Sequence, residues 1–206
     1  LSALHLRSFR LDGALAVVAI AFSWLVLAFQ LGIWHSNVLP MPEEMAKQYL
    51  QLMHLDEANL AVLLAVIAVS PAICEELLFR GAILSGLEKR LPAWLLIPVV
   101  GLLFGVFHLS IYRVALTGLT GMVLTYVVWR TRSLWNGILL HFLFNASAVL
   151  VASERIPDSV SLAMRNLSSA QAGLPWWLIG LAASVMSAGI GYLHLRFPGP
   201  DKSASE

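Results

Sequence analysis

The chain has 206 residues, of which 59% are hydrophobic and 12% are charged, and its formal net charge at pH 7 is +1. Soluble domains carry roughly 25% charged residues, so this composition indicates a polytopic membrane protein, and the small net charge argues against a nucleic-acid partner. The single cysteine, Cys74, excludes an internal disulfide and a cysteine-based zinc cluster. We expect one integral-membrane domain over residues 1–206, in contact with membrane lipid.

Six apolar segments suit helical crossings of the hydrocarbon, which take about 17 to 25 residues each. They lie approximately at Leu11–Trp34, Asn59–Leu84, Ala93–Leu109, Val114–Trp129, Leu134–Ala152 and Pro175–Phe197. The predicted fold class is therefore all-α, a polytopic membrane helix bundle of about six transmembrane helices. Because the first segment is too long for a signal-peptide core and no initiator methionine precedes it, we interpret the chain as a piece of a longer polypeptide.

The connection between the first two crossings contains apolar residues at helical spacing. They are Met41, Met45, Tyr49, Leu52 and Met53. This pattern is typical of a helix that lies in the membrane interface, although a plain solvated connector is equally consistent with it.

Lysine and arginine residues alternate between the two ends of the predicted crossings. One side holds Arg7, Arg10, Lys89, Arg90, Arg130, Arg132, Arg196 and Lys202; the other holds Lys47, Arg113, Arg155 and Arg165. Cytoplasmic connections of membrane proteins carry the excess of positive charge. The pattern predicts that both termini are cytoplasmic, and that the protein lies in the cell membrane if its source is prokaryotic.

Three charged residues, Glu75, Glu76 and Arg80, interrupt the second crossing. Each ionised side chain at bilayer depth costs at least about 2.5 to 3.5 kcal/mol, so such residues are rare unless they are paired, hydrated or used in function. Glu76 and Arg80 are four residues apart, which allows a salt bridge along the helix. Glu75 is rotated from Glu76 by about 100°, which leaves it free to face a different neighbour.

Two further crossings carry polar residues. His108 lies near the end of the third, and His141 and Asn145 lie one helical turn apart in the fifth, so that their side chains project together. Two carboxylates, two histidines and a carboxamide supply the groups of a hydrolytic site. The same residues could instead line a proton or ion path, and a single histidine in a membrane helix is often only a hydrogen-bonding residue between helices.

Three motifs carry a family resemblance. EELLFR (Glu75–Arg80) fits Glu-Glu-x-x-x-Arg, FGVFH (Phe104–His108) fits Phe-x-x-x-His, and HFLFN (His141–Asn145) fits His-x-x-x-Asn. In this order, each within an apolar helix, they resemble the motifs of the CAAX protease and bacteriocin-processing (CPBP, or Abi) family of intramembrane endopeptidases. The resemblance covers residues 66–151.

The resemblance implies an intramembrane endopeptidase that cleaves peptide bonds near the membrane surface. In this family's mechanism Glu75 would activate a water molecule that His108 helps to hold, and His141 and Asn145 would donate to the oxyanion. Glu76 and Arg80 would brace the site. The implied partner is a peptide or protein substrate, with prenylated CAAX proteins and bacteriocin leaders as the two candidate classes.

The resemblance leaves the metal open, because the family was long described as metalloprotease-like. Glu75, His108 and His141 together would satisfy a catalytic zinc site. A metal-free glutamate mechanism fits an Asn145 donor better, so we expect no cofactor. The alternative from another class is a non-catalytic membrane module, linked to transport, to bacteriocin immunity or to a scaffold, in which the polar cluster conducts protons or binds a partner.

Hydrolysis requires the polar residues to meet. We expect Glu75, His108, His141 and Asn145 to lie within about 10 Å of one another, because groups that serve one water and one carbonyl must reach both. Upright straight helices would place Glu75 and His108 at different depths. Strong tilt, or bending at Pro71 or Pro98, would bring them together.

Overall fold

The computed structural model describes residues 11–53, 59–152 and 173–197, and in these ranges its regular elements are helices without strands. They are α1 (Leu11–Val38), α2 (Glu43–Met53), α3 (Leu60–Leu63), η2 (Leu64–Val69), α4 (Ser70–Glu76), η3 (Leu77–Ile83), α5 (Leu84–Leu87), α6 (Ala93–Phe107), α7 (Val114–Thr131), α8 (Leu134–Ala152) and α10 (Trp176–Arg196). The elements from α3 to α5 form one continuous helix. The all-α, polytopic fold class is confirmed.

Five of the six predicted crossings are helices long and apolar enough to span a membrane. The remaining one, predicted over Ala93–Leu109, is the shorter helix α6. It starts after Pro92, whose ψ of 152° is extended, and ends where Leu109 takes a positive φ of 50°. Its 15 residues extend about 22 Å, less than the hydrocarbon thickness of about 30 Å. The α6 helix is therefore too short to cross the hydrocarbon by itself, unlike the crossing expected over Ala93–Leu109.

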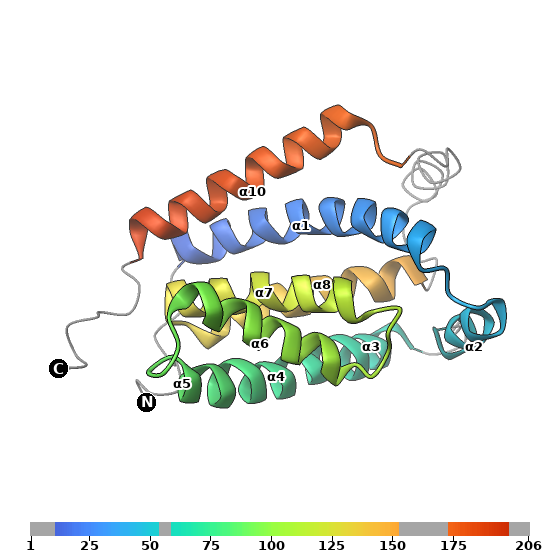
Figure 1. Cartoon of the computed structure of the whole chain (residues 1–206), viewed down its shortest axis with the longest axis horizontal. Coiled ribbons are helices and arrows are strands. Elements are labelled where there is room, and N and C mark those ends of the chain that lie inside the picture. Colours follow the sequence, from blue (N-terminus) through green and yellow to red (C-terminus); the bar gives the residue numbers. More distant parts are fainter. Residues whose placement is uncertain (1–10, 54–58, 153–172, 198–206) are drawn as a thin grey trace.

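The helices form layers, as Figure 1 shows. Helix α10, in orange-red, packs mainly on α1, in blue; α1 in turn packs on α8 and α7, and the α4 region packs on α8. Helix α6 packs on α7 and runs diagonally across its neighbours in this view. The tilt of this helix relative to the membrane stays a prediction.

Helices α6 and α7 approach each other at backbone distance because glycines face each other at their contact. A Cβ atom at Gly105 would lie 2.6 Å from the Val114 carbonyl oxygen, and one at Gly101 would lie 2.7 Å from the Met122 nitrogen. Small residues allow this close packing in membranes, where van der Waals contact drives helix association. The contact fixes the depth at which α6 presents its C-terminal end.

The helix from α3 to α5 departs from α-helical hydrogen bonding in two places. At the end of η2 the Ser70 N–H donates to the Ala65 carbonyl, and at the end of η3 the Leu84 N–H donates to the Phe79 carbonyl, each five residues earlier. Pro71 follows the first of these π-helical turns, inside the continuous helix, where its missing N–H removes one hydrogen bond to the preceding turn. Such π segments occur often at functional sites.

The ends of the helices agree with the expected alternation. Helix α1 begins, α10 ends, and the α5–α6 and α7–α8 connections lie at one end of the bundle, on the left of Figure 1. Four of the predicted cytoplasmic cations, Lys89, Arg90, Arg132 and Arg196, belong to these segments. That this end faces the cytoplasm stays a prediction, and Arg7, Arg10 and Lys202 lie outside the described residues.

The predicted connector helix is present as α2 at the opposite end of the bundle. Glu43 and Glu44 lie in its first turn and pair with Lys47. Its expected location in the membrane interface stays a prediction. The side chains of Tyr49, Leu52 and Met53, part of its apolar face, lie outside the described part of the structure.

Candidate active site

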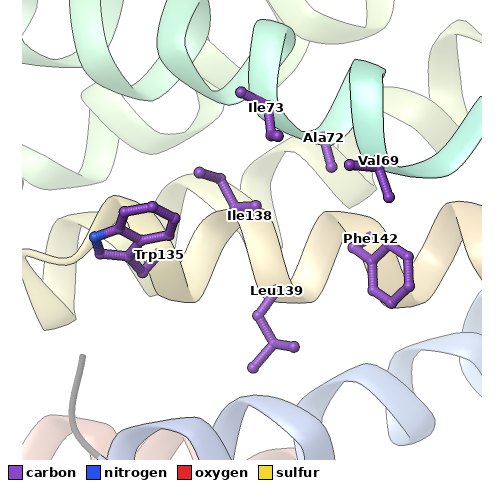
Figure 2. A pocket seen from close by; sticks show the side chains of 7 residues that line it. All are labelled: Val69, Ala72, Ile73, Trp135, Ile138, Leu139 and Phe142. Atoms are coloured by element: carbon purple, nitrogen blue, oxygen red, sulfur yellow. The ribbon is translucent and has the colours of Figure 1, made fainter. Parts of the chain in front are cut away.

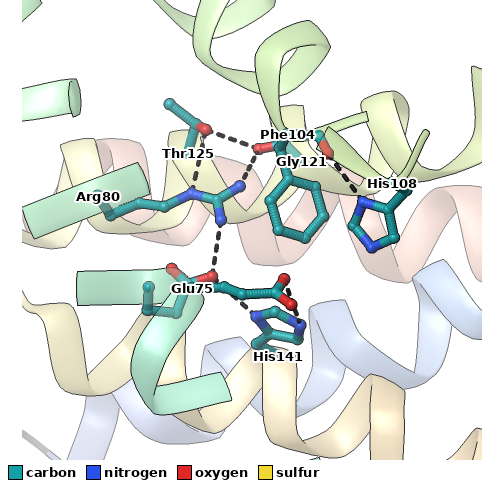
Figure 3. Close-up of polar contacts among 8 residues, drawn as sticks. Glu75, Arg80, Phe104, His108, Gly121, Thr125 and His141 are labelled. Atoms are coloured by element: carbon teal, nitrogen blue, oxygen red, sulfur yellow. Dashed lines mark hydrogen bonds and ion pairs between the residues drawn. The ribbon is translucent and has the colours of Figure 1, made fainter. Parts of the chain in front are cut away.

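The buried charges of the second crossing pair as their spacing indicates. Arg80 Nη1 donates to Glu76 Oε1 across 2.7 Å, and both side chains are completely buried, at 0% exposed. The pair lies on the face of the α4–η3 helix that packs against α7 and α8. Figure 3 shows how neighbouring polar side chains gather around it. Neither charge could be held in this place without the other.

The remaining donors of Arg80 are bound by α7. Nη2 donates to the Gly121 carbonyl across 2.8 Å, and Nε donates to Thr125 Oγ1 across 3.4 Å. The guanidinium also lies over the Phe104 ring, 4.7 Å from its centroid. Sequence reasoning missed these contacts, because a backbone carbonyl and a threonine hydroxyl some 40 residues away leave no distinctive pattern.

His141 lies between the two carboxylates. Its Nδ1 is 3.0 Å from Glu76 Oε1, and its Nε2 is 3.9 Å from Glu75 Oε2. An ionised carboxylate can only accept, so Nδ1 carries the hydrogen. Glu75 and Glu76 lie about 100° apart on their helix and reach opposite edges of this one imidazole.

His108 caps the C-terminal end of α6. Its Nδ1–H donates to the Phe104 carbonyl across 2.8 Å, which leaves the Nε2 lone pair available as an acceptor. The Phe104 ring lies edge-to-face against His108 at 4.9 Å and against His141 at 5.6 Å between centroids. Phe104 therefore joins the two histidines, as Figure 3 shows.

Asn145 lies one turn beyond His141 on α8 and is half-buried. Among the described residues it makes no hydrogen bond. The structure thus brings Glu75 and Glu76 directly against His141 and connects His108 to them through Phe104. The position of Asn145 relative to the reacting groups stays a prediction, as does the 10 Å cluster of all four residues.

The carboxylates also have unpartnered oxygens. Glu75 Oε2 and Glu76 Oε2 are buried and accept no hydrogen bond from the protein. Glu76 Oε2 lies against Gly137 of α8, where a Cβ atom would come within 2.8 Å of it and would clash with Val128. Gly137 is a further position that sequence reasoning missed; it lets the backbone of α8 approach the ion pair.

A metal centre is not preassembled by these residues. The part of the chain that the structure describes contains no group of three or more His, Cys, Asp or Glu side chains placed to hold one ion. The proposed zinc ligands Glu75 and His141 meet, but the Phe104 ring contacts both His141 and the third candidate, His108. We derive no step through a metal, and the expected absence of a cofactor stays a prediction.

A separate apolar pocket of about 370 Å³ lies between the η2–α4 segment and α8 (Figure 2). Its lining residues are Val69, Ala72, Ile73, Trp135, Ile138, Leu139 and Phe142. None of these side chains can act as an acid, a base or a nucleophile. This pocket therefore adds no reactive group to the candidate site.

Residues 57–147 match the family described as type II CAAX prenyl endopeptidase, Rce1-like. The matched range contains all three motifs and every polar residue of the candidate site. Comparisons with curated proteins and with solved structures gave no match.

Proposed function

From the match of residues 57–147 to the type II CAAX prenyl endopeptidases, we propose that this integral membrane protein is an intramembrane endopeptidase. It hydrolyses peptide bonds of substrates that reach the membrane surface, lipid-anchored chains among them. The observation that carries the proposal is His141 held between two carboxylates, one of which is tied to a buried arginine while the other is not.

Glu75 is the proposed general base. Its Oε2 is buried, accepts no hydrogen bond from the protein and faces Nε2 of His141, so it is free to accept a proton from a water molecule. Glu76 cannot take this role, because its Oε1 already accepts from Arg80 and from His141. The available Nε2 lone pair of His108 supplies the second acceptor that orients the water.

His141 and Asn145 are the proposed donors to the oxyanion. Because Nδ1–H of His141 is donated to Glu76, donation from Nε2 requires the doubly protonated ring. An imidazolium and Arg80 together balance the charges of Glu75 and Glu76. Donors placed in advance around a developing oxyanion each lower the barrier by roughly 3 to 4 kcal/mol.

Replacing the base tests the proposal. The purified protein, reconstituted in liposomes, is given fluorogenic peptides with and without a prenylated C-terminal cysteine. Glu75→Gln should reduce kcat at least about 100-fold and leave the melting temperature unchanged, because Glu75 makes no hydrogen bond that is lost. Glu44→Gln on α2 is the matched control and should cleave normally.

Two outcomes would contradict the proposal. Glu75→Gln with wild-type cleavage would remove Glu75 from the mechanism. A wild-type protein that cleaves no peptide, yet passes protons across the liposome membrane in a manner that Glu75→Gln abolishes, would favour the non-catalytic membrane module instead.

A further inference from the structure

We propose that α7 supplies a positioning site for the reaction, formed by the Thr125 hydroxyl and the Gly121 carbonyl, which we call the arginine dock. The dock orients Arg80, and through Arg80 and Glu76 it fixes the ring of His141. This inference rests on the proposed function. It adds to the site two residues that belong to none of the three motifs.

The first step is the geometry of the guanidinium. Arg80 Nη2 donates to the Gly121 carbonyl and Nε to Thr125 Oγ1, while Thr125 Oγ1 itself donates to the Gly121 carbonyl across 2.6 Å. The guanidinium is planar and its donors form a rigid fork. Two donors held by α7 therefore set the direction of the third, Nη1, which meets Glu76.

The second step transfers that orientation to the imidazole. Glu76 Oε1 accepts from Arg80 Nη1 and also from His141 Nδ1. The place of this one oxygen decides where the Nδ1–H of His141 points and how the ring is oriented. The opposite edge of the ring, Nε2, is the edge that faces Glu75.

The third step is the enclosure of the dock. Thr125 and Arg80 are completely buried, and the Phe104 ring covers the guanidinium. Gly121 also forms the contact with α6, where a Cβ atom would lie 2.8 Å from the Gly101 carbonyl oxygen. Hydrogen bonds in such a low-dielectric place are stronger than in water. The bonds to Thr125 and Gly121 can therefore fix the orientation of the Arg80 guanidinium.

Helix α7 contains a matched control. Thr131 is also buried, and its hydroxyl donates to the Val127 carbonyl across 2.7 Å, which repeats the bond from Thr125 to Gly121. Thr131 has no contact with Arg80. Replacing either threonine with valine removes one buried hydroxyl and keeps the side-chain shape, so that loss of an intrahelical bond is common to both variants.

The experiment compares Thr125→Val, Thr125→Ser and Thr131→Val by peptide cleavage and by 15N NMR of histidine-labelled protein. We expect Thr125→Val to lower kcat about 3- to 10-fold, the effect of one hydrogen bond, with KM within about twofold. The His141 Nδ1 signal should shift, because the hydrogen bond from Nδ1 to Glu76 Oε1 loses its fixed orientation. Thr125→Ser should restore both, and Thr131→Val should change neither.

The result that overturns the dock is a Thr125→Val protein that matches Thr131→Val in kcat and in the His141 spectrum. The NMR measurement also separates this inference from the proposed function. If the wild-type protein cleaves nothing, the function fails, but a His141 spectrum that responds to Thr125→Val and recovers in Thr125→Ser still supports the dock.

Discussion

Two ion pairs with the same spacing lie in contrasting regions of the molecule. On α2, Lys47 Nζ lies 2.9 Å from Glu43 Oε1, and the two side chains are 55% and 82% exposed. On the α4–η3 helix, Arg80 Nη1 lies 2.7 Å from Glu76 Oε1, and both side chains are 0% exposed. In each case a glutamate precedes a cation by four residues.

The contrast shows that surroundings, rather than geometry, decide what an ion pair contributes. Water and salt screen the α2 pair, and exposed pairs contribute about 0 to 1 kcal/mol. The α4–η3 pair has given up hydration, so each charge depends on the other. It also depends on α7, whose Gly121 carbonyl accepts from Arg80, and on α8, whose His141 donates to Glu76 Oε1.

The largest expected effect comes from breaking the buried pair. Arg80→Ala leaves Glu76 charged and without its strongest partner, which should lower the free energy of unfolding by about 3 to 5 kcal/mol. Thermal unfolding in detergent measures the loss. Glu75→Gln, next to the pair but outside it, should melt with the wild type. An Arg80→Ala protein with unchanged melting would show that the pair is not a brace.

The second effect concerns a polar residue with no partner. Asn145 makes no hydrogen bond among the described residues, so Asn145→Ala should leave the melting temperature nearly unchanged. If Asn145 donates to the oxyanion, kcat should fall about 100- to 1,000-fold with little change in KM. Asn145→Asp should be worse, because it directs a negative charge at the developing anion.

A chelator tests the same mechanism in a second way. In a zinc mechanism Asn145 would lie outside the ligands and its loss would cost only about 10- to 100-fold. We expect activity to persist in 1,10-phenanthroline. Inactivation by the chelator, with recovery on adding zinc, would overturn the metal-free mechanism and leave the peptidase assignment in place.

The third effect tests how closely α8 must approach the pair. Gly137→Ala places a Cβ atom 2.8 Å from Glu76 Oε2, and overpacking of this kind costs about 1 to 3 kcal/mol. Gly180→Ala on α10 is the matched control, because a Cβ atom there meets nothing within 4 Å. Equal melting temperatures for the two variants would mean that α8 can move away from Glu76 without loss of stability.

The smallest effect belongs to the exposed pair. Lys47→Ala should change the free energy of unfolding by less than about 1 kcal/mol, and the difference from the wild type should shrink further in 1 M salt. Melting curves at low and high salt measure both. A loss as large as that of Arg80→Ala would remove the contrast between the two regions.

Local spacing predicted much of this structure. Hydrophobic length located the helices, and the separation of Glu76 and Arg80 indicated their ion pair, because both signals act within a few helical turns. The end of α6 was less predictable: Leu109 is apolar and continues the hydropathy pattern, yet it has a positive φ and the helix ends two residues earlier, at Phe107.

Contacts between distant segments could not be predicted in this way. Gly121, Thr125 and Gly137 reach the charges only after α7 and α8 have packed, and glycine and threonine are ordinary residues in membrane helices. The contact of both carboxylates with His141 is likewise set by tertiary packing. It depends on the depth at which α8 meets α4, which helical periodicity does not specify.

The π-helical turn η3 has a consequence for how related chains can differ in length. Because a hydrogen bond there spans five residues instead of four, the segment accommodates one residue more than an α-helix of equal extent. Removing one residue after Arg80, from residues 81–83, would restore the regular pattern without opening the helix and would keep the spacing of Glu76 and Arg80. We therefore expect homologous chains to tolerate a one-residue gap here, so that this continuous helix can vary in length by one residue during evolution.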